Sequence, residues 1–430
     1  MTALGPDTTA EIDLPALRKR TRWALIGSVF PAGMGMTATF AATSLAAKEI
    51  TDNDGLATLA ATMTAIGGAI AAVPLGRYMN EHGRRPGLMW AWLIGAAGAA
   101  IAFTGVVTEL YILLVIGGIG VGMGQAASLA ARYSAADLAP QDRKASEIGL
   151  VMWAGSIGSV LGPTIALGGT GWVAANLLGL DELAGPYLMG TLVFIAAAMI
   201  INTFLHPDPL QVAKQLGNAT ETKRPTLVES FQKLFTNRLA TIAVFATAVG
   251  QGVMVSVMTV TPLHMDDGAH EKTVIGLVIS LHVVGMYFFA PVIGWLVDRV
   301  RTELMVAAAG LILFAGAELA SHTDPEDSLG VFVGLFLVGL GWSFSMIAGS
   351  ALLSSVFPVD ERASVQGAAD FTMITFGATG GILGGIVVEA TDYHTLSHYA
   401  AVLALSLIAA ALYPIATNVK GPKKPEPASA

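Results

Sequence analysis

Two ionisable residues, Asp370 and His282, stand inside long apolar stretches of the sequence. Asp370 lies in QGAADFTMITFGATGG and His282 lies in VISLHVVGMYFFAP. A charge at the centre of a bilayer costs about 2.5–3.5 kcal/mol even on insertion scales, so ionisable residues there are rare and often functional. Desolvation favours the neutral form of a carboxylic acid, and an imidazole titrates within the range of physiological proton gradients. Both side chains are therefore candidates for binding and releasing protons.

Each of these residues also has a purely structural interpretation. Asp370 can sit at the cytoplasmic mouth of its helix and form an ion pair with Arg362 or Arg132. A lone histidine in a helix usually makes a fixed hydrogen bond, and His282 would then take no part in proton transfer. The sequence leaves both interpretations open for both residues.

The elements that carry these residues are predicted to be membrane-spanning helices. The 430-residue chain is 54% hydrophobic and only 13% charged, and its mean hydropathy is +0.65. A soluble domain of this length cannot bury so much apolar surface. A helix needs about 20 mostly apolar residues to cross a bilayer, and twelve such runs follow one another along the chain. We therefore predict an all-α integral membrane protein with twelve transmembrane helices.

The order of the apolar runs and the position of the charges predict a topology. The predicted parts are a cytoplasmic tail (1–22), a six-helix bundle (23–205), a cytoplasmic linker (206–238), a second six-helix bundle (239–416) and a cytoplasmic tail (417–430). All Lys and Arg residues except Lys48 and Lys272 then lie on the cytoplasmic side, as the positive-inside rule requires. We expect a multi-pass protein of the inner (plasma) membrane with both termini in the cytoplasm.

The two halves of the chain resemble each other in sequence. VGMGQAAS (Val121 to Ser128), in the fourth apolar run, matches VGLGWSFS (Val338 to Ser345), in the tenth, at an offset of 217 residues. Duplication at half the chain length predicts two pseudo-symmetric six-helix bundles that face each other, which is the arrangement used for alternating access.

Several other classes of function find no support in the sequence. The chain has no cysteine and a net charge of −8, which excludes thiol-based metal sites and argues against nucleic acid as a partner. The runs GGIGVG and GGILGG lie inside apolar spans with no preceding strand, so they do not fit a nucleotide-binding loop. We expect no enzymatic activity, no cofactor and no bound metal.

A basic hinge after the second apolar run has a counterpart in the second half. The hinge reads GRYMNEHGRR (Gly76 to Arg85), and its counterpart reads GWLVDRVR (Gly294 to Arg301). Both resemble the Gly-x-x-x-Asp-Arg-x-Gly-Arg-Arg loop of the major facilitator superfamily. The matching residues are Gly76, Gly83, Arg84 and Arg85 in the first copy and Gly294, Asp298 and Arg299 in the second. Asn80 and Glu81 replace the family's Asp and Arg in the first copy.

This resemblance covers essentially the whole chain and implies a secondary transporter. In the family, the loop acts as a conformational latch between the two bundles. The resemblance implies that Asp298 meets the positive N-terminal end of the fifth helix near Ser146. It also implies that Arg84 or Arg85 pairs with Asp137.

The fifth apolar run is similar to the antiporter signature of the same family. The matching residues are Gly149, Gly158, Gly162 and Pro163, whereas the final glycine pair is displaced by two residues. Glycines at this spacing let helices approach closely, and the proline removes a backbone hydrogen bond so that the helix can bend. The resemblance implies a drug/proton antiporter, with close packing that has no mechanistic role as the alternative.

In this family the substrate path runs between the first, fourth, seventh and tenth helices. The residues expected to line it here are Met34, Thr37, Gln125, Ser128, Gln251, Met254, Trp342 and Ser345. This lining is neutral, mildly polar and rich in methionine, which suits an uncharged or weakly amphipathic organic molecule better than an anion.

These observations together predict a monomeric transporter in a lipid bilayer that exports small organic or drug-like compounds in exchange for protons. Two alternatives remain open. One is the uptake or facilitated passage of a small nutrient by the same mechanism. The other is a ligand sensor or lipid-handling protein of the same fold that transports nothing.

Overall fold

The protein is built of helices. The computed structural model describes residues 13–216, 226–269, 272–324 and 328–416. Within these ranges, twelve helices are long and apolar enough to cross a membrane, and no residue is in a strand. The predicted all-α fold with twelve transmembrane helices is therefore confirmed.

The first bundle contains six spanning helices. They are α1 (Leu14–Thr51), α2 (Asp54–His82), α3 (Arg84–Val107), α4 (Tyr111–Asp137), α5 (Lys144–Ile165) and α7 (Ala184–Phe204). A five-residue π-helix, η1 (Ala166–Thr170), and the short α6 (Gly171–Leu178) connect α5 to α7. The core lies where α3 packs on α4 and α7, and Trp92 stacks there on Phe194 with ring centroids 5.8 Å apart.

The second bundle repeats this plan with one helix broken in two. Its helices are α10 (Arg238–Asp267), α11 (Lys272–Tyr287), α12 (Ala290–Arg299), α13 (Thr302–Ser321), α14 (Ser328–Val356), α15 (Val359–Ala390) and α16 (Tyr393–Ala416). α11 and α12 form one span that is interrupted at Phe288 and Phe289. The cause is Pro291 near the start of α12, because a proline has no N–H to donate to the carbonyl four residues earlier and its ring clashes with that carbonyl.

The helix α1 begins at Leu14, nine residues before the apolar run that predicted it. Asp13 caps it by accepting a hydrogen bond from the Ala16 amide at 3.0 Å. Arg18 then donates to the Leu138 carbonyl at 2.7 Å, and Arg22 forms an ion pair with Glu147. These partners on the loop after α4 and on α5 stabilise a polar extension that hydropathy alone does not reveal.

The predicted linker at 206–238 contains two short helices in its described part. They are α8 (Pro209–Leu216) and α9 (Leu227–Thr236). Lys214 of α8 donates to the Asn80 carbonyl at 2.6 Å, which fixes α8 against the end of α2. α9 packs on α10 and α15. The linker is thus attached to both bundles.

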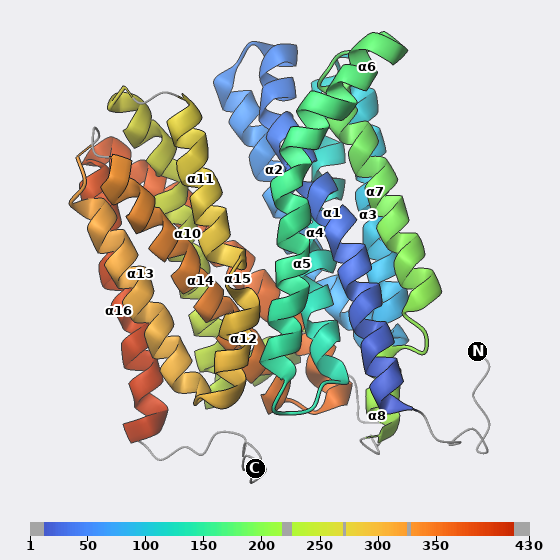
Figure 1. Ribbon diagram of the computed structural model, residues 1–430, viewed down its shortest axis with the longest axis vertical. Coiled ribbons are helices and arrows are strands. Elements are labelled where there is room, and N and C mark those ends of the chain that lie inside the picture. Colours follow the sequence, from blue (N-terminus) through green and yellow to red (C-terminus); the bar gives the residue numbers. More distant parts are fainter. Residues whose placement is uncertain (1–12, 217–225, 270–271, 325–327, 417–430) are drawn as a thin grey trace.

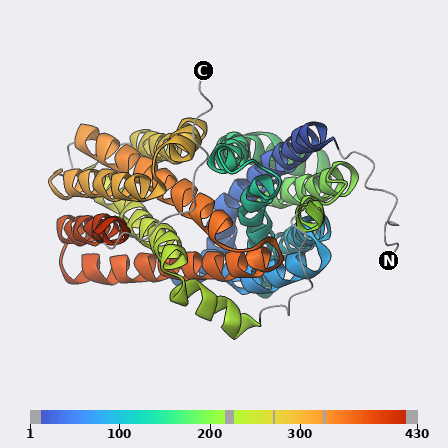
Figure 2. The ribbon, with the colours of Figure 1, turned by 90° about the horizontal axis from the view of Figure 1, so that it is seen from below.

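The two bundles lie side by side and contact each other through α2 with α15 and through α5 with α12. Figure 1 shows these contacts near the end where α1 begins and α16 ends, whereas the bundles diverge toward the opposite end. Figure 2 shows the same arrangement from below. We call the end that holds Arg84, Lys144, Arg299 and Arg362 the basic end, and the end that holds Glu49, Asp181 and Asp392 the acidic end.

Candidate functional site

A cavity of about 180 Å³ lies between the bundles, above their contact at the basic end. α1, α4 and α5 of the first bundle line it together with α11 and α14 of the second. The polar and aromatic residues of its wall are Thr37, Gln125, Ser128, Arg132, Ser156, Ser159, Tyr287 and Trp342. Met36, Met152 and Met346 add soft apolar surface to the wall.

Four of the eight residues expected to line the substrate path are among the lining residues, namely Thr37, Gln125, Ser128 and Trp342. The other four support the wall from behind. Met34 packs against the cluster of Ala38 and Met189, and Met254 is buried in the core of the second bundle. Ser345 is fully buried and donates to the Trp342 carbonyl at 2.8 Å, and the Gln251 side chain accepts from the Trp342 indole N–H.

Three hydroxyl groups of the wall turn their protons away from the cavity. Thr37 Oγ1 lies 2.9 Å from the Ser159 carbonyl oxygen, Ser156 Oγ lies 2.6 Å from that of Trp153, and Ser159 Oγ lies 3.1 Å from that of Gly155. A carbonyl oxygen can only accept, and a hydroxyl has one proton to donate. These three hydroxyls therefore present lone pairs to the cavity, and they favour a ligand that donates hydrogen bonds.

Two aromatic rings form the wall on the side of the second bundle. The Trp342 and Tyr287 rings meet edge to face at 74°, with centroids 5.4 Å apart. Trp342 Nε1 donates to Gln251 Oε1 at 2.7 Å, which holds the indole plane in place. A ring held in this way offers a fixed apolar face to a ligand.

Arg132, at the floor of the cavity, forms an ion pair with a residue of the other bundle. Arg132 of α4 donates to Asp370 Oδ1 of α15 at 2.5 Å, and the two residues are 2% and 5% exposed. Arg132 also donates from Nε to Ser350 Oγ of α14 at 3.0 Å, and its guanidinium lies 4.4 Å from the centre of the Tyr133 ring. Of the two partners considered for Asp370, Arg132 is the one that the structure places beside it.

His282 lies outside the cavity lining, at the contact of α11 with α14. It is fully buried, and its Nδ1 lies 2.7 Å from the Leu335 carbonyl oxygen. Since the carbonyl can only accept, Nδ1 carries the proton. Nε2 has no hydrogen-bond partner among the described residues. This is the geometry of a structural hydrogen bond between two helices of one bundle.

A second buried cluster joins the bundles at the basic end. Arg84 donates to Asp137 Oδ2 at 2.8 Å and to Gln366 Oε1 at 2.6 Å. Arg362 of α15 approaches Asp137 at 3.6 Å. Arg84 and Asp137 belong to the first bundle, and Gln366 and Arg362 belong to the second. The cluster is therefore part of the contact between the halves.

The second copy of the hinge makes the equivalent contact from the second bundle to the first. Asp298 of α12 accepts hydrogen bonds from the backbone N–H groups of Ala145 at 2.9 Å and Ser146 at 2.8 Å, at the start of α5. A carboxylate at this position satisfies the orphan amide groups of a helix N-terminus and complements its positive partial charge. The neighbouring Arg299 instead lies over the Trp295 ring of its own helix, 4.2 Å from the ring centre.

The hinge glycines are required for different structural reasons. A Cβ atom at Gly76 would lie 2.6 Å from the Ala363 carbonyl oxygen, and one at Gly294 would lie 2.5 Å from that of Ala145. Both positions are therefore points where the two bundles approach backbone to backbone. Gly83 has φ of +100°, which a residue with a side chain rarely adopts.

Arg85 and Arg84 are adjacent but have different partners. The Arg85 side chain donates to the Asn202 carbonyl at 2.9 Å, within the first bundle. Its backbone N–H donates to Asp208 Oδ2 at 2.6 Å, and Asp208 Oδ1 also accepts from the Leu210 amide at 3.0 Å. Asp208 thus caps both α3 and α8. Sequence reasoning missed this role, although an Asp directly before a Pro that opens a helix is a helix-start signal.

The residues of the antiporter-like pattern pack α5 onto two neighbours. A Cβ atom at Gly158 would lie 1.9 Å from the Phe30 carbonyl oxygen, and one at Gly162 would lie 2.5 Å from that of Met34, both on α1. Gly149 faces α12 of the second bundle, with 2.3 Å between such an atom and the Ala290 carbonyl oxygen. Pro163 stands in the last turn of α5, directly before η1.

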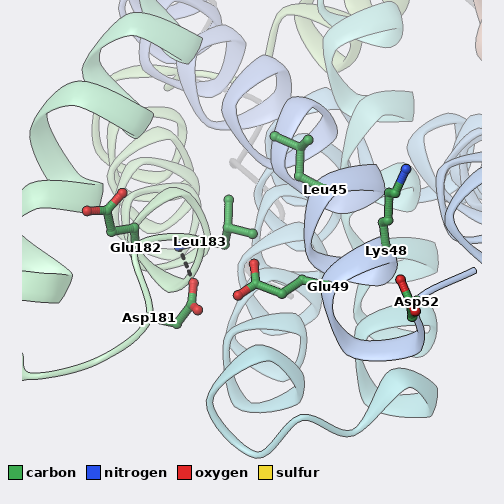
Figure 3. A pocket seen from close by; sticks show the side chains of 7 residues that line it. All are labelled: Leu45, Lys48, Glu49, Asp52, Asp181, Glu182 and Leu183. Atoms are coloured by element: carbon green, nitrogen blue, oxygen red, sulfur yellow. Dashed lines mark hydrogen bonds between the residues drawn. The ribbon is translucent and has the colours of Figure 1, made fainter.

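A wider hollow of about 760 Å³ lies at the acidic end of the first bundle (Figure 3). Its lining residues are Leu45, Lys48, Glu49, Asp52, Asp181, Glu182 and Leu183. Asp181 accepts from the Leu183 amide at 2.6 Å, which fixes the turn before α7. Within the described parts of the chain, no group of three or more His, Asp or Glu side chains is arranged to hold a metal ion.

Comparison with known proteins assigns the family. The profile of the Major Facilitator Superfamily matches residues 25–270 and 256–430. The uncharacterized MFS-type transporters YddS and YdeG of Bacillus subtilis are 33% and 32% identical to this chain, and the alignments cover 91% of it and 90% and 91% of the relatives. The riboflavin transporter RfnT of Brucella anthropi is 25% identical over 87% of this chain and 90% of its own.

Solved structures share the fold at low sequence identity. FucP in its outward conformation superposes with a TM-score of 0.71 at 16% identity, over 91% of this chain and 98% of FucP. The proton:xylose symporter XylE superposes with a TM-score of 0.72 at 15% identity, over 94% of this chain and 96% of XylE. Since the family profile and the relatives span nearly the whole sequence, this chain belongs to the major facilitator superfamily and is a multi-pass secondary transporter of small molecules, not an enzyme.

Proposed function

We propose that this transporter exports a small, uncharged or weakly amphipathic organic compound from the cytoplasm in exchange for protons. The basic end then faces the cytoplasm of the plasma membrane, and the state described here is open toward the outside. The observation that carries this proposal is the ion pair of Arg132 with Asp370, because Arg132 lines the floor of the cavity and the pair joins the two bundles.

This position makes Asp370 suitable for coupling proton movement to a conformational change. Ionised Asp370 attracts Arg132 across the boundary between the bundles and stabilises the contact at the basic end. A proton that reaches Asp370 from the outside removes this attraction and leaves Arg132 with neutral partners, among them Ser350. The basic end can then open, and the proton leaves to the cytoplasm as the compound binds. Ionised Asp370 finally re-forms the pair and closes the basic end.

The lining supports the class of substrate. Arg132 is engaged by Asp370, so the wall offers no unpaired cation for an anionic substrate. The hydroxyls of Thr37, Ser156 and Ser159 present lone pairs, and Trp342 presents a ring face. A flat organic molecule with hydrogen-bond donors fits these features best.

Uptake of a nutrient is the second candidate function. It is favoured by the similarity to RfnT, whose name gives riboflavin as its substrate. Riboflavin is a flat heteroaromatic compound with several hydrogen-bond donors, so it belongs to the class that the lining favours. In this alternative, the same pair of Arg132 and Asp370 couples the movement of the compound to that of a proton in the same direction across the membrane.

One experiment separates these functions. Purified protein is reconstituted into liposomes that contain a pH-sensitive dye and are loaded with riboflavin or one of a panel of flat aromatic compounds, and the vesicles are diluted into compound-free buffer. Compound that leaves in exchange for protons acidifies the interior, whereas compound that leaves together with protons makes it alkaline. Saturable binding of a compound without any flux would overturn both proposals and would indicate a sensor.

A further inference from the structure

The short helix α9 begins with a capping box made by two of its own residues. Thr226 Oγ1 accepts from the Glu229 amide at 3.2 Å, and Glu229 Oε2 accepts from the Thr226 amide at 2.7 Å. This reciprocal capping box satisfies two of the orphan N–H groups at the helix start. The ten residues of α9 therefore form a defined surface.

The side chains of α9 divide into two faces. With 100° of rotation per residue, Val228, Phe231, Leu234 and Phe235 fall within one arc of about 120°. The opposite arc contains the polar residues Glu229, Gln232, Lys233 and Thr236. An arc of this width is typical of a helix that buries one side against apolar material.

The protein covers only one part of the apolar arc. Leu234 is fully buried, and the Phe231 ring meets the Phe371 ring of α15 edge to face at 5.9 Å. In contrast, Val228 is 60% exposed and Phe235 is 55% exposed. Contacts with α10 and α15 thus leave two large apolar side chains on the outer edge of the arc.

This outer edge continues the lipid-facing surface of α15. Phe376 and Ile382 of α15 are 40% and 61% exposed, and a spanning helix turns such residues toward acyl chains. Phe371 is 36% exposed and links this surface to α9 through its contact with Phe231. Figure 2 shows α9 in yellow-green, protruding from the outline of the two bundles beside α15.

We propose that α9 is an interfacial helix that lies in the plane of the membrane at the basic end and inserts Val228 and Phe235 at the boundary between lipid headgroups and acyl chains. The occupant of its outer apolar edge is the bilayer itself. Its polar arc faces water, as in other amphipathic helices that lie on a membrane. The inference does not depend on the substrate or on proton coupling.

The position of α9 gives this membrane contact a consequence for the cavity floor. Lys233 forms an ion pair with Glu361 in the first turn of α15, and Phe231 contacts Phe371, the neighbour of Asp370. The bilayer therefore holds α9, and α9 holds α15 near the residue that pairs with Arg132. Lipid packing at the basic end acts on this part of the second bundle.

The absence of cysteine in the sequence makes a direct test simple. A nitroxide label is attached to single-cysteine variants of the full chain in liposomes, with the paramagnetic reagents on both sides of the membrane. Val228→Cys and Phe235→Cys are compared with the matched variants Gln232→Cys and Thr236→Cys of the same helix. We expect the first two labels to collide several-fold more with dissolved oxygen than with a water-soluble nickel chelate, and the other two to show the reverse.

Two results would overturn the proposal. Equal collision of all four labels with the nickel chelate would place the apolar edge in water. Dipolar broadening between labels on Val228→Cys or Phe235→Cys, together with low access of both reagents, would make a second copy of the chain the occupant. Size-exclusion profiles that match the unmodified protein confirm that each variant is folded.

Discussion

The guanidinium of Arg132 lies 2.5 Å from the carboxylate of Asp370, and the two side chains come from different bundles. Both are buried, Arg132 lines the floor of the cavity, and Tyr133 also points its hydroxyl at Asp370 from 3.4 Å. A change in the charge of Asp370 therefore acts on the bottom of the cavity and on the contact between the bundles at once. In the proposed mechanism, this shared position links the binding of a proton to a conformational change.

The substitution Asp370→Asn keeps the size of the side chain and an acceptor oxygen but cannot take up a proton. We expect compound-driven proton movement in dye-loaded liposomes to disappear. Exchange of labelled for unlabelled compound should continue, because it requires no net proton transfer. The control is His282→Asn, whose amide can replace the bond from Nδ1 to the Leu335 carbonyl and should keep coupling. Unaltered coupling in Asp370→Asn would remove this residue from the mechanism.

The same substitution should also lower stability, since it leaves Arg132 as a buried cation beside a neutral amide. Loss of one partner of a buried pair costs about 3–5 kcal/mol. We therefore expect Asp370→Asn to unfold at a lower temperature than the parent protein in detergent. The double variant Arg132→Met/Asp370→Asn, which removes both charges, should recover much of this loss. If the unfolding temperature of the double variant were no higher than that of the single variant, the ion pair would not account for the loss of stability.

Much of the fold follows from hydropathy. In lipid, the backbone N–H and C=O groups must form their hydrogen bonds within each helix, and each helix needs a minimum number of apolar residues to cross the bilayer. The end of α4 shows the limit of this reasoning. Its apolar run ends near Arg132, but the helix continues to Asp137. Arg132 remains helical and buried beside Asp370 of the other bundle, and Asp137 remains so between Arg84 of its own bundle and Arg362 of the other. No local pattern contains that information.

The hinge shows a similar limit. Arg84 and Arg85 are equivalent in the sequence pattern, and either was expected to pair with Asp137. The structure distinguishes the two residues. Arg84 points toward the contact between the bundles and pairs with Asp137, whereas Arg85 points toward Asn202 of its own bundle. Arg84 also donates to Gln366, a partner 282 positions further along the chain that no local pattern reveals.

This difference predicts unequal effects of two similar substitutions. Arg84→Gln removes hydrogen bonds that join the bundles at the basic end, so the population open at the acidic end should fall. Arg85→Gln should leave this population unchanged. The readout is labelling of Ser128→Cys, a cavity residue, by a membrane-impermeant maleimide added outside intact cells. We expect several-fold slower labelling with Arg84→Gln only, and equal rates in both variants would contradict a role of Arg84 in closing the basic end.

The aromatic wall of the cavity predicts which tryptophan contributes to substrate binding. Trp342→Ala removes a ring that Gln251 holds in position, and an aromatic contact contributes about 0.5–1.5 kcal/mol beyond its buried area. The KM or Kd for a flat aromatic substrate should rise about threefold to tenfold or more. Trp172→Ala is the control, because Trp172 is 55% exposed on α6. Equal affinities of the two variants would exclude stacking on Trp342.

The glycines of α5 and α15 allow a matched test of close helix packing. A Cβ atom at Gly158 would lie 1.9 Å from the Phe30 carbonyl oxygen, whereas one at Gly385 would meet nothing within 4 Å. Gly158→Ala must therefore push α1 away from α5, and we expect a lower unfolding temperature and slower transport. Gly385→Ala adds the same methyl group to a helix that has room for it, and the better helix propensity of alanine, about 1 kcal/mol at most, should keep or slightly raise stability. Thermal unfolding and transport rates of the two variants, measured in parallel, check this expectation. A loss of equal size in both would mean that alanine itself, and not the approach of α1 to α5, disturbs these helices.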